Sequence, residues 1–293
     1  MTTRALLLGV DGGGTGCRAR LCASSGATLG EASGGPANIR FGLDQSFAAV
    51  LQATAQCLRQ AGLSSHDLKR IVACLALAGA SEPADLTAAQ GYRHPFGHLL
   101  VTADADAACI GAHRGRDGGV IVAGTGTVGW AILGGRHFRV GGWGLPVSDE
   151  GSGAWLGCEA LRRVLWAHDG RIGWTGLLMA LFEQLHSDPH AIVRFTSEAS
   201  PRDFGSLAPL VVEHASRGDP AASDLMRLAA AHIDALADRL IAFGTERLAL
   251  TGGLAPYLEP RLGDATRRRL VHPWGDALEG ALRLARAAAA GNH

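Results

Sequence analysis

Lysine is almost missing from this sequence: its 293 residues contain Lys69 and no other lysine. A P-loop needs the segment Gly-Lys-Ser/Thr to bind nucleotide phosphates, and that segment does not occur. The formal net charge at pH 7 is +0, so nothing in the composition favours binding to nucleic acid or to an anionic membrane surface. A phosphate site in this chain therefore has to work without lysine.

The spacings by which proteins usually bind zinc are also missing. The six cysteines form no Cys-x-x-Cys pair, and the 12 histidines form no His-Glu-x-x-His segment. The cysteines lie in apolar segments, which predicts buried free thiols in a reducing compartment. The apolar run at the N-terminus ends at Asp11 and is too short for the core of a signal peptide. We therefore expect a cytoplasmic protein without a zinc site.

No segment of the sequence is typical of a membrane span. The longest stretch without a charged residue, 118–135, contains seven glycines and a Gly-Thr-Gly-Thr turn, which is typical of a hairpin. The chain is 47% hydrophobic and 18% charged, as an ordinary globular protein is. Its length suffices for one large domain or for two lobes.

Glycine is abundant, and its first concentration follows a predicted strand. The segment consists of an apolar run, an acid and a glycine-rich turn: Leu6–Val10, Asp11, Gly12, Gly13, Gly14 and Thr15. Glycine permits a tight reversal and lets a ligand approach the backbone closely. Open amides in such a turn form a concave set of donors that suits phosphate, and Asp11 can bind the Mg²⁺ that accompanies it. An ordinary hairpin turn is the alternative.

The pattern recurs later in the chain, which favours the phosphate interpretation over the hairpin alone. An apolar run from residue 119 breaks at Thr125, Gly126 and Thr127 and then resumes as a second apolar run. A third glycine turn follows a late strand and suits close approach of a flat ligand such as adenosine: Thr251, Gly252 and Gly253. A Rossmann loop would lie between a strand and a helix, whereas the first two turns lie between predicted strands.

Three acids are candidates for chemistry because of where they stand. Asp104 follows a short predicted strand and opens a helix, which is where open α/β sheets place reacting groups. Asp149 and Glu150 precede another helix among small residues and could bind sugar hydroxyls or a metal ion. For each of these acids, simple capping of a helix N-terminus is the alternative. A long helix is expected after Asp219, and residues 174–217 are expected to be helical without a chemical signature.

With these residues in view, the chain resembles the actin-like ATPase superfamily. Within it, the chain is most similar to the branch of N-acetylglucosamine kinases, bacterial glucosamine kinases and BadF/BadG-type ATPases. The similarity extends from end to end, and the three glycine turns correspond to two phosphate motifs and an adenosine motif. Further similar stretches are Thr15–Arg20, Ala37–Ile39, Leu75–Ala80, Ser148–Gly153, Pro201–Gly205 and Asp276–Gly280.

This resemblance implies an α/β, two-lobed ribonuclease-H-like fold with duplicated sheet-and-helix domains and a nucleotide and sugar cleft between them. The implied lobes are residues 1–115 and 116–274, the second with a helical insert, and a terminal helix at about 275–293 packs back on the first. It further implies ATP and Mg²⁺ as cofactors, and no nucleic acid or membrane partner is expected. A homodimer is suggested by the resemblance alone.

The resemblance also assigns roles to single residues. By position, Asp104 matches the catalytic acid that takes the proton from the sugar 6-hydroxyl, and Asp11 matches the residue that holds Mg²⁺. The expected nucleotide contacts are Gly12, Gly13, Gly14, Thr15, Thr125, Gly126, Thr127, Thr251, Gly252 and Gly253. The expected sugar contacts are Asn38, Gly79, Asp104, Gly126, Asp149 and Glu150.

One departure bears on the substrate. N-acetylglucosamine kinases tend to have Ser-Asn after Gly-Thr-Gly, and this chain has Thr127 and Val128 there. Loss of an amide beside the sugar favours an amino sugar with a free amine, namely glucosamine. The alternatives are an N-acetylglucosamine or other hexose kinase, an ATPase that activates a dehydratase, and a non-catalytic ATP-binding regulator. Isolated cysteines disfavour the dehydratase activator, which needs an iron–sulfur cluster, and the presence of Asp104 and Asp149 disfavours the regulator.

Overall fold

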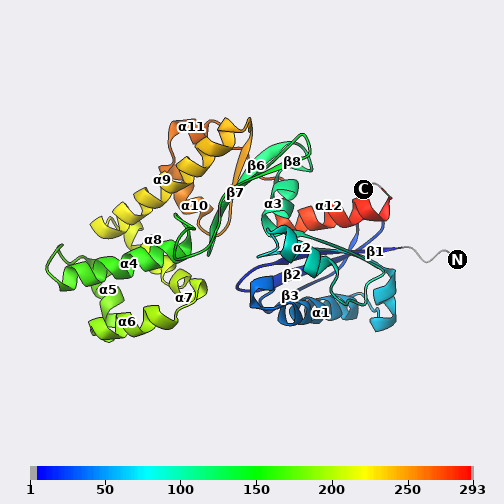
Figure 1. The fold of residues 1–293 in the computed structure, drawn as a ribbon, viewed down its shortest axis with the longest axis horizontal. Coiled ribbons are helices and arrows are strands. Elements are labelled where there is room, and N and C mark those ends of the chain that lie inside the picture. The colour runs from blue at the N-terminus through cyan, green and yellow to red at the C-terminus, as the bar shows by residue number, and fades with distance from the viewer. Residues whose placement is uncertain (1–4, 292–293) are drawn as a thin grey trace. The chain divides into compact units, whose positions relative to one another are not determined.

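The computed structural model describes residues 5–291, and its contacts divide the chain into two compact units (Figure 1). Unit 1 runs to Val120 and also takes in residues 131–136 and the chain from His272 onward. Unit 2 consists of residues 121–130 and 137–271. The domain limits expected from the sequence, 1–115, 116–274 and 275–293, stay a prediction.

Unit 1 is built on a five-stranded sheet with the order β3-β2-β1-β4-β5. β1 and β2 form an antiparallel hairpin, whereas β1, β4 and β5 are parallel. Parallel strands end at the same edge of a sheet, so the residues that follow β1, β4 and β5 become neighbours there. The strands are β1 Leu6–Gly12, β2 Cys17–Ala23, β3 Thr28–Gly34, β4 Ile71–Leu77 and β5 His98–Ala103.

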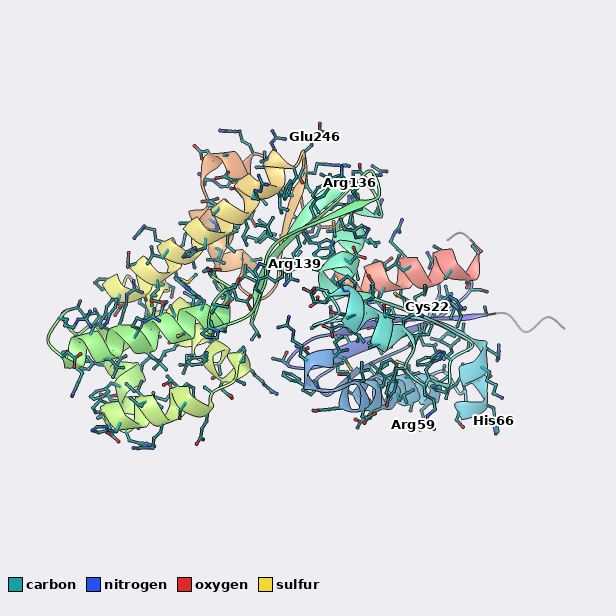
Figure 2. All side chains as sticks on the ribbon, in the orientation of Figure 1. Cys22, Arg59, His66, Arg136, Arg139 and Glu246 are labelled. Atoms are coloured by element: carbon teal, nitrogen blue, oxygen red, sulfur yellow. The ribbon has the colours of Figure 1, made fainter. Side chains whose placement is uncertain are left out.

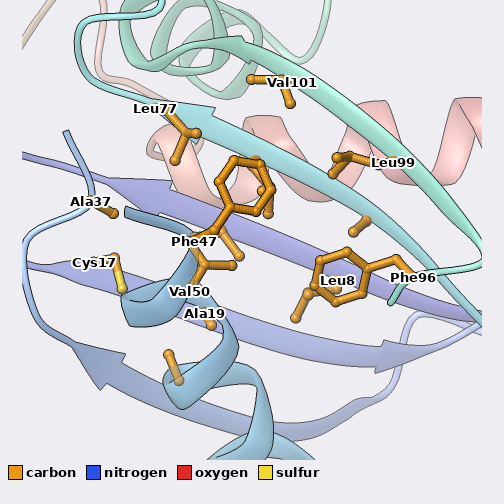
Figure 3. Packing of buried hydrophobic residues seen from close by; sticks show 14 of the residues in the cluster. Leu8, Cys17, Ala19, Ala37, Phe47, Val50, Leu77, Phe96, Leu99 and Val101 are labelled. Atoms are coloured by element: carbon orange, nitrogen blue, oxygen red, sulfur yellow. The ribbon is translucent and has the colours of Figure 1, made fainter. Parts of the chain in front are cut away.

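Helices cover both faces of this sheet (Figure 1). α1 packs on one face, where alternate residues of β1 such as Leu8 and Val10 join Phe47 in a buried core (Figure 3). α12 packs on the other face against β1 and β4 and also against α3. The helices of unit 1 are η1 Ile39–Phe41, α1 Leu43–Gln60, η2 Ser65–Arg70, α2 Pro83–Gln90, α3 Asp104–His113 and α12 Ala277–Ala289.

The second sheet has four strands in the order β8-β7-β6-β9. They are β6 Gly118–Ala123, β7 Thr127–Leu133, β8 Arg136–Gly141 and β9 Leu248–Thr251. The helices of unit 2 are α4 Gly153–His168, α5 Gly176–Gln184, α6 Pro189–Glu198, α7 Pro201–Gly205, α8 Ala208–Ser216, α9 Pro220–Ala242, α10 Ala255–Leu258, η3 Glu259–Arg261 and α11 Asp264–Arg267. The expected α/β fold with repeated sheet-and-helix architecture is confirmed.

Local sequence signals predict the start of the longest helix correctly and misplace the start of the first helix. Asp219 caps α9 by accepting a hydrogen bond from the Ala222 amide at 3.0 Å, as the Asp-Pro signal predicts. The sequence also predicts Asp44 as the N-cap of the first helix, which is wrong, because α1 begins at Leu43 and its N-cap is Gly42. The Asp44 carboxylate instead accepts a hydrogen bond from the Tyr92 hydroxyl.

The six cysteines are free, and all but Cys158 are buried, as the sequence predicts. Burial raises the pKa of Cys57 to about 11, so this residue remains a thiol at neutral pH. Among the described residues, no helix combines the length and the apolar character that crossing a membrane requires.

Candidate functional site

The candidate residues of unit 1 meet at the carboxyl edge of its sheet. Gly12 at the end of β1 pairs with Leu77 at the end of β4, and Leu77 pairs with Ala103 at the end of β5. Asp104 comes directly after β5, at the same edge of the sheet as the turn that follows β1. This register therefore brings together residues that are about 90 positions apart in the sequence, by the geometry of parallel strands.

The first glycine turn presents its backbone in a defined direction. The carbonyls of Gly12 and Gly13 accept hydrogen bonds from the amides of Ala78 at 2.7 Å and Ala37 at 3.0 Å. In a trans peptide the carbonyl and the next N–H point opposite ways, so the Gly14 amide points away from Ala37. The Gly13 amide itself donates to the Gly16 carbonyl at 2.8 Å. Gly13 therefore closes the turn, and Gly14 offers a donor to a ligand.

Packing requires glycine at position 12. A Cβ there would lie 2.8 Å from the Ala37 carbonyl oxygen and 2.8 Å from the Leu77 side chain. A Cβ at Gly14 would meet nothing closer than Asn38 Nδ2 at 3.8 Å. Thr15 is exposed at the tip of the turn.

Asn38 and Gly79 lie next to this turn in unit 1. Asn38 forms an isolated parallel bridge with Ala78, and its Oδ1 accepts a hydrogen bond from the Arg40 amide at 3.0 Å. Gly79 has φ +84°, and a Cβ there would lie 2.7 Å from Asn38 Oδ1. With Oδ1 committed to the backbone, the Nδ2 group beside Gly14 is the part of the Asn38 amide that can donate to a ligand.

Asp104 is the first residue of α3 and is half-buried. The N-cap position belongs to Ala103, and no side chain makes a capping hydrogen bond, so the capping alternative for Asp104 is wrong. Asp104 Oδ1 accepts a hydrogen bond from the Ala105 amide at 2.9 Å, and Asp106 Oδ2 accepts one from Thr102 Oγ1 at 2.7 Å. The Asp104 carboxylate is thus held at the sheet edge, in the first turn of a helix whose dipole favours negative charge.

Asp11 lies one residue before the end of β1 and makes an ion pair with Arg18, from Oδ2 to Nη2 at 2.6 Å. Arg18 Nη1 also contacts Asp276 Oδ2 at 2.8 Å. Partial burial works against the charge on Arg18, but the hydrogen bond and charge of Asp11, together with Asp276, raise the pKa of Arg18. Burial opposes ionisation of Asp276 too, yet the Glu279 amide and Arg18 hold its pKa below the ordinary value. Arg18 and Asp276 therefore interact as ions at neutral pH.

Asp11 fits a magnesium ion that arrives with a nucleotide. Mg²⁺ usually binds proteins through one or two carboxylates and fills its remaining positions with water and phosphate oxygens. The carboxylate of Asp11 offers hard oxygen ligands. Its Oδ1 is available to a metal ion, because it makes no hydrogen bond or ion pair with other described residues. Within residues 5–291, no group of three His, Cys, Asp or Glu side chains is arranged to bind a metal.

The second glycine turn, in unit 2, is held by a helix N-terminus. The amides of Gly153 and Ala154, at the start of α4, donate to the carbonyls of Gly124 at 2.8 Å and Thr125 at 3.1 Å. By the same peptide geometry, the amides of Thr125 and Gly126 point away from α4. The turn therefore presents two donors on the side opposite its scaffold, which suits an anion such as phosphate.

Asp149 contacts this second turn from a strained backbone conformation. Its φ is +66°, which is uncommon for a residue other than glycine and is found often at functional sites. Its Oδ1 accepts a hydrogen bond from the Gly144 amide at 3.0 Å. A Cβ at Gly126 would lie 2.6 Å from Asp149 Oδ2, so Gly126 leaves room for this carboxylate. Glu150, the next residue, is exposed.

The capping alternative for Asp149 and Glu150 is wrong. Ser152 is the N-cap of α4, and its Oγ accepts a hydrogen bond from the Trp155 amide at 3.0 Å. The two acids precede the helix in a glycine-rich loop. Neither acid is therefore the N-cap of α4.

The third glycine turn lies against the second. Gly252 has φ +96°, and a Cβ there would lie 2.3 Å from the Ala123 carbonyl oxygen. That same carbonyl accepts a hydrogen bond from the Leu254 amide at 3.0 Å. Gly253 has open space around its Cα, and Thr251 ends β9. Unit 2 thus places the expected adenosine turn beside the strand that enters the expected phosphate turn.

Thr127 is a predicted nucleotide contact whose side-chain hydroxyl is buried. It is the first residue of β7, with 3% of its surface exposed. Its Oγ1 makes no hydrogen bond to any described residue. A buried hydroxyl without a partner is costly, so a ligand that reached it would gain a hydrogen bond.

Three contacts of the site are absent from the sequence-based expectations. Arg18 pairs with both Asp11 and Asp276. The register of the β1–β2 hairpin sets Asp11 opposite Arg18 and is the one signal that could have revealed part of this arrangement. Arg139 on β8 supports the loop before Asp149 (Figure 2). It donates to the carbonyls of Gly141, at 3.0 Å, and Gly142, and it stacks on the Trp143 ring at 3.9 Å. No sequence pattern indicates the Arg139 contacts.

Comparison with known families and proteins gives consistent matches. Residues 8–264 match the BadF/BadG/BcrA/BcrD ATPase family. A glucosamine kinase of Vibrio cholerae is 38% identical over 278 residues, which are 95% of each chain. An N-acetylmuramic acid/N-acetylglucosamine kinase of Clostridium acetobutylicum is 27% identical over 232 residues, or 76% of this chain and 75% of that one.

Solved structures match over nearly the whole chain. A provisionally assigned N-acetylglucosamine kinase of Chromobacterium violaceum aligns with a TM-score of 0.90 and 37% identity, over 96% of this chain and 99% of that one. A ROK family glucokinase of Streptomyces griseus, solved with glucose and AMPPNP, aligns with a TM-score of 0.60 and 22% identity over 96% and 99% of the chains. The glucokinase likeness concerns the fold alone.

Proposed function

Because the chain belongs to the BadF/BadG/BcrA/BcrD ATPase family, we propose that it is an ATP-dependent kinase that phosphorylates the 6-hydroxyl of an amino sugar, with glucosamine preferred. The observation that carries this proposal is the match to a glucosamine kinase at 38% identity over 95% of both chains. The products are then glucosamine 6-phosphate and ADP. ATP and the sugar are the two small-molecule partners.

Asp104 is the proposed catalytic residue. Phosphoryl transfer asks a protein mainly for positioning and for stabilisation of charge, and one carboxylate suffices to accept the hydroxyl proton. Support for this role is that Asp104 stands at the same sheet edge as the turn that follows β1. Its Oδ1 is already oriented by the Ala105 amide. The carboxylate would take the proton as the sugar oxygen attacks.

The glycine turns are proposed to bind the nucleotide. The amides of Gly14, Thr125 and Gly126 point away from their scaffolds and would donate to phosphate oxygens. In the proposed set, Gly12, Gly13, Thr15 and Thr127 shape these turns, and Thr251, Gly252 and Gly253 receive the adenosine. Asp11 would hold Mg²⁺, and the bound ion supplies positive charge to the phosphates.

Residues of both units are proposed to contact the sugar. Asn38 and Gly79 do so beside the first turn, and Asp149 and Glu150 do so near Gly126. A carboxylate at Asp149 suits the amine of glucosamine better than an acetamide, because a carboxylate attracts an ammonium group. The absence of an amide side chain at positions 127 and 128 points in the same direction.

N-acetylglucosamine is the second candidate substrate. It is favoured by the names of the Clostridium acetobutylicum relative and of the structure that matches at a TM-score of 0.90. Because the same fold and mechanism serve both sugars, one or two side chains decide between them. A homodimer and a cytoplasmic location remain part of this proposal.

A substrate panel tests the proposal. ADP release is followed with Mg²⁺-ATP against glucosamine, N-acetylglucosamine, N-acetylmannosamine and glucose. We expect glucosamine to give a kcat/KM at least about tenfold above the others, which is about 1.4 kcal/mol of discrimination. A higher value for N-acetylglucosamine would overturn the substrate but leave the mechanism. If no sugar raises ADP release above the rate with ATP alone, the kinase assignment is wrong.

A metal titration tests the role of Asp11. We expect Asp11→Ala to raise the Mg²⁺ concentration needed for half-maximal rate, because one ligand of the ion is lost. An unchanged titration curve would exclude Asp11 from metal binding.

A further inference from the structure

Arg18 connects Asp11 to a second carboxylate. Asp11 and Arg18 are directly opposite each other on the β1–β2 hairpin, so their side chains share one face of the sheet. One guanidinium nitrogen contacts Asp11 Oδ2 at 2.6 Å, and its neighbour contacts Asp276 Oδ2 at 2.8 Å. A guanidinium offers several donors in a rigid planar fork, which lets a single side chain hold both carboxylates.

Asp276 is itself anchored by the helix that it caps. Its Oδ1 accepts a hydrogen bond from the Glu279 amide at 3.1 Å, at the start of α12. α12 lies against β1 so closely that a Cβ at Gly9 would be 2.6 Å from Leu282 Cγ. The far carboxylate is therefore fixed to the same sheet that carries Asp11.

α12 also packs tightly on α3, the helix that begins with Asp104. A Cβ at Gly111 of α3 would lie 2.0 Å from the Asp276 carbonyl oxygen, and a Cβ at Gly280 of α12 would lie 1.9 Å from the Ala107 carbonyl oxygen. The two helix backbones approach each other closely at these glycines. Arg18 thus connects the strand of the proposed metal ligand to a helix that is seated on the helix of the proposed catalytic residue.

We propose that Arg18 is a positioning residue for Asp11. It fixes the orientation of the carboxylate and offsets its charge, so that Asp11 binds a divalent cation only when the cation arrives with nucleotide phosphates. This inference rests on the proposed function.

The charges of Asp11, Arg18 and Asp276 predict how the loss of Arg18 changes metal binding. Asp11 and Asp276 contribute two negative charges and Arg18 one positive charge, which leaves the group at −1. Without Arg18 the group would be at −2, with two carboxylates that formerly shared one guanidinium. Neighbouring carboxylates attract divalent cations. Loss of Arg18 should therefore create metal binding in the absence of nucleotide and, at the same time, reduce turnover because Asp11 loses its orientation.

Arg20 provides a matched control on the same face of the same strand. Its Nε contacts Glu31 at 2.6 Å, and its Nη1 contacts Glu279 of α12 at 3.6 Å. Like Arg18, it connects β2 to α12, but its ion pairs do not include Asp11. A purely structural role of these arginines would therefore be lost equally in Arg18→Gln and Arg20→Gln.

The experiment compares the full-length protein with Arg18→Gln, Arg18→Lys and Arg20→Gln. First, the Tm is measured against MgCl₂ or MnCl₂ alone, without nucleotide. We expect the Tm of Arg18→Gln to rise with the metal, because binding to the folded state stabilises it, while the parent and Arg20→Gln do not respond. Arg18→Lys should not respond either, because it keeps the charge. Adding Asp11→Asn to Arg18→Gln should abolish the response.

Second, steady-state kinetics are measured at saturating Mg²⁺-ATP. We expect Arg18→Gln to lower kcat by about 10- to 100-fold, as loss of a residue that orients a metal ligand usually does, with the sugar KM nearly unchanged. Arg18→Lys should lower kcat as well, because an ammonium group cannot hold two carboxylates in one plane. Arg20→Gln should keep kcat within about twofold, since the ion pairs of Arg20 do not include Asp11.

Two results would overturn the proposal. One is that Arg18→Gln and Arg20→Gln behave alike in both measurements; the other is that Arg18→Gln shows no metal response while its kcat is unchanged. Failure of the proposed function is recognised separately, because the parent protein would then phosphorylate no sugar, whereas the metal response of the nucleotide-free variants would still decide the role of Arg18.

Discussion

The two glycine turns have similar sequences but are held in place differently. The turn after β1 is braced by the amides of Ala37 and Ala78, which belong to loops at the edge of a parallel sheet. The turn after β6 is braced by the first amides of α4 and by the neighbouring turn at Gly252. In both, the scaffold engages carbonyls and so directs the following amides outward. The donors toward a ligand are therefore alike, although the parts that fix them are unrelated.

The glycines of these turns also have different structural roles. In the first turn, Gly12 avoids a clash with the protein's own backbone, and Gly14 has free space. In the second turn, Gly126 makes room for the Asp149 carboxylate, and in the third turn Gly252 permits contact with Ala123. Replacing glycine by alanine should therefore lower stability at Gly252 and weaken ligand binding at Gly126. The following variants test this difference.

The largest effect is expected for Asp104→Asn, which concerns unit 1 alone. We expect kcat to fall about 10²- to 10⁴-fold, the usual contribution of a general base, while binding of the sugar largely survives. Steady-state kinetics and an equilibrium sugar titration measure the two quantities. Asp106→Asn is the control, because Asp106 bonds to Thr102 in the same helical turn. A loss of less than about threefold in Asp104→Asn would remove this residue from the mechanism.

A large loss of stability is expected for Gly252→Ala in unit 2. The new Cβ would lie 2.3 Å from the Ala123 carbonyl oxygen, at a backbone φ of +96° that disfavours alanine. We expect the free energy of unfolding to fall by about 3 kcal/mol, because a clash adds to conformational strain. Urea unfolding measures it, with Gly253→Ala as the control, since a Cβ there meets nothing within 4 Å. Equal unfolding midpoints for the two variants would contradict the expectation.

Gly126→Ala should act on sugar binding through Asp149. Its Cβ would lie 2.6 Å from Asp149 Oδ2 and would displace that carboxylate. We expect the sugar KM to rise about tenfold, as the loss of one charged contact of about 1.4 kcal/mol would produce. The double variant Gly126→Ala/Asp149→Asn should be little worse than Asp149→Asn alone, because both changes remove one interaction. Fully additive effects would show that Gly126 acts in another way.

The smallest effect is expected for Asp219→Asn in unit 2, and it concerns the free energy of unfolding at acid pH. Burial raises the pKa of this carboxyl, but hydrogen bonds from the Leu177 and Ala222 amides outweigh it and lower the pKa below the ordinary value. A lowered pKa contributes stability above the unfolded value of about 3.9 and loses it as the pH falls through the folded value. Because an asparagine side chain has one acceptor oxygen in place of two, Asp219→Asn should lose one of these hydrogen bonds and lower the free energy of unfolding at pH 7 by about 1 kcal/mol.

The same variant should also flatten the acid limb of the stability curve. Urea midpoints from pH 7 to pH 3 measure this, and the parent protein should lose more stability below about pH 4 than Asp219→Asn does. Parallel curves for the two proteins would show that Asp219 does not titrate in the unfolding transition.

Much of the fold was predictable because its signals are local. The apolar runs at β1, β4 and β6 and the Asp219-Pro220 start of α9 are patterns of neighbouring residues, and each was located correctly. The expected N-cap of α1, Asp44, lies two positions after the observed N-cap, Gly42, because propensity alone does not show that Gly42 ends the preceding turn. The capping alternatives for Asp104 and Asp149 could be rejected only when the helix starts were seen.

The sequence by itself determined the α/β class, the three glycine turns and the acids at strand ends, since each depends on residues that are adjacent in the chain. Only the tertiary structure decided that Gly13 closes its own turn while Gly14 presents a donor, that Gly126 faces Asp149, and that Arg18 joins Asp11 to Asp276. These contacts depend on strand register and on the packing of helices that are far apart in the sequence. Contacts between residues 258 positions apart, as Arg18 and Asp276 are, leave no periodic trace in a single sequence, because side-chain periodicity reports which face a residue occupies and not what it meets there.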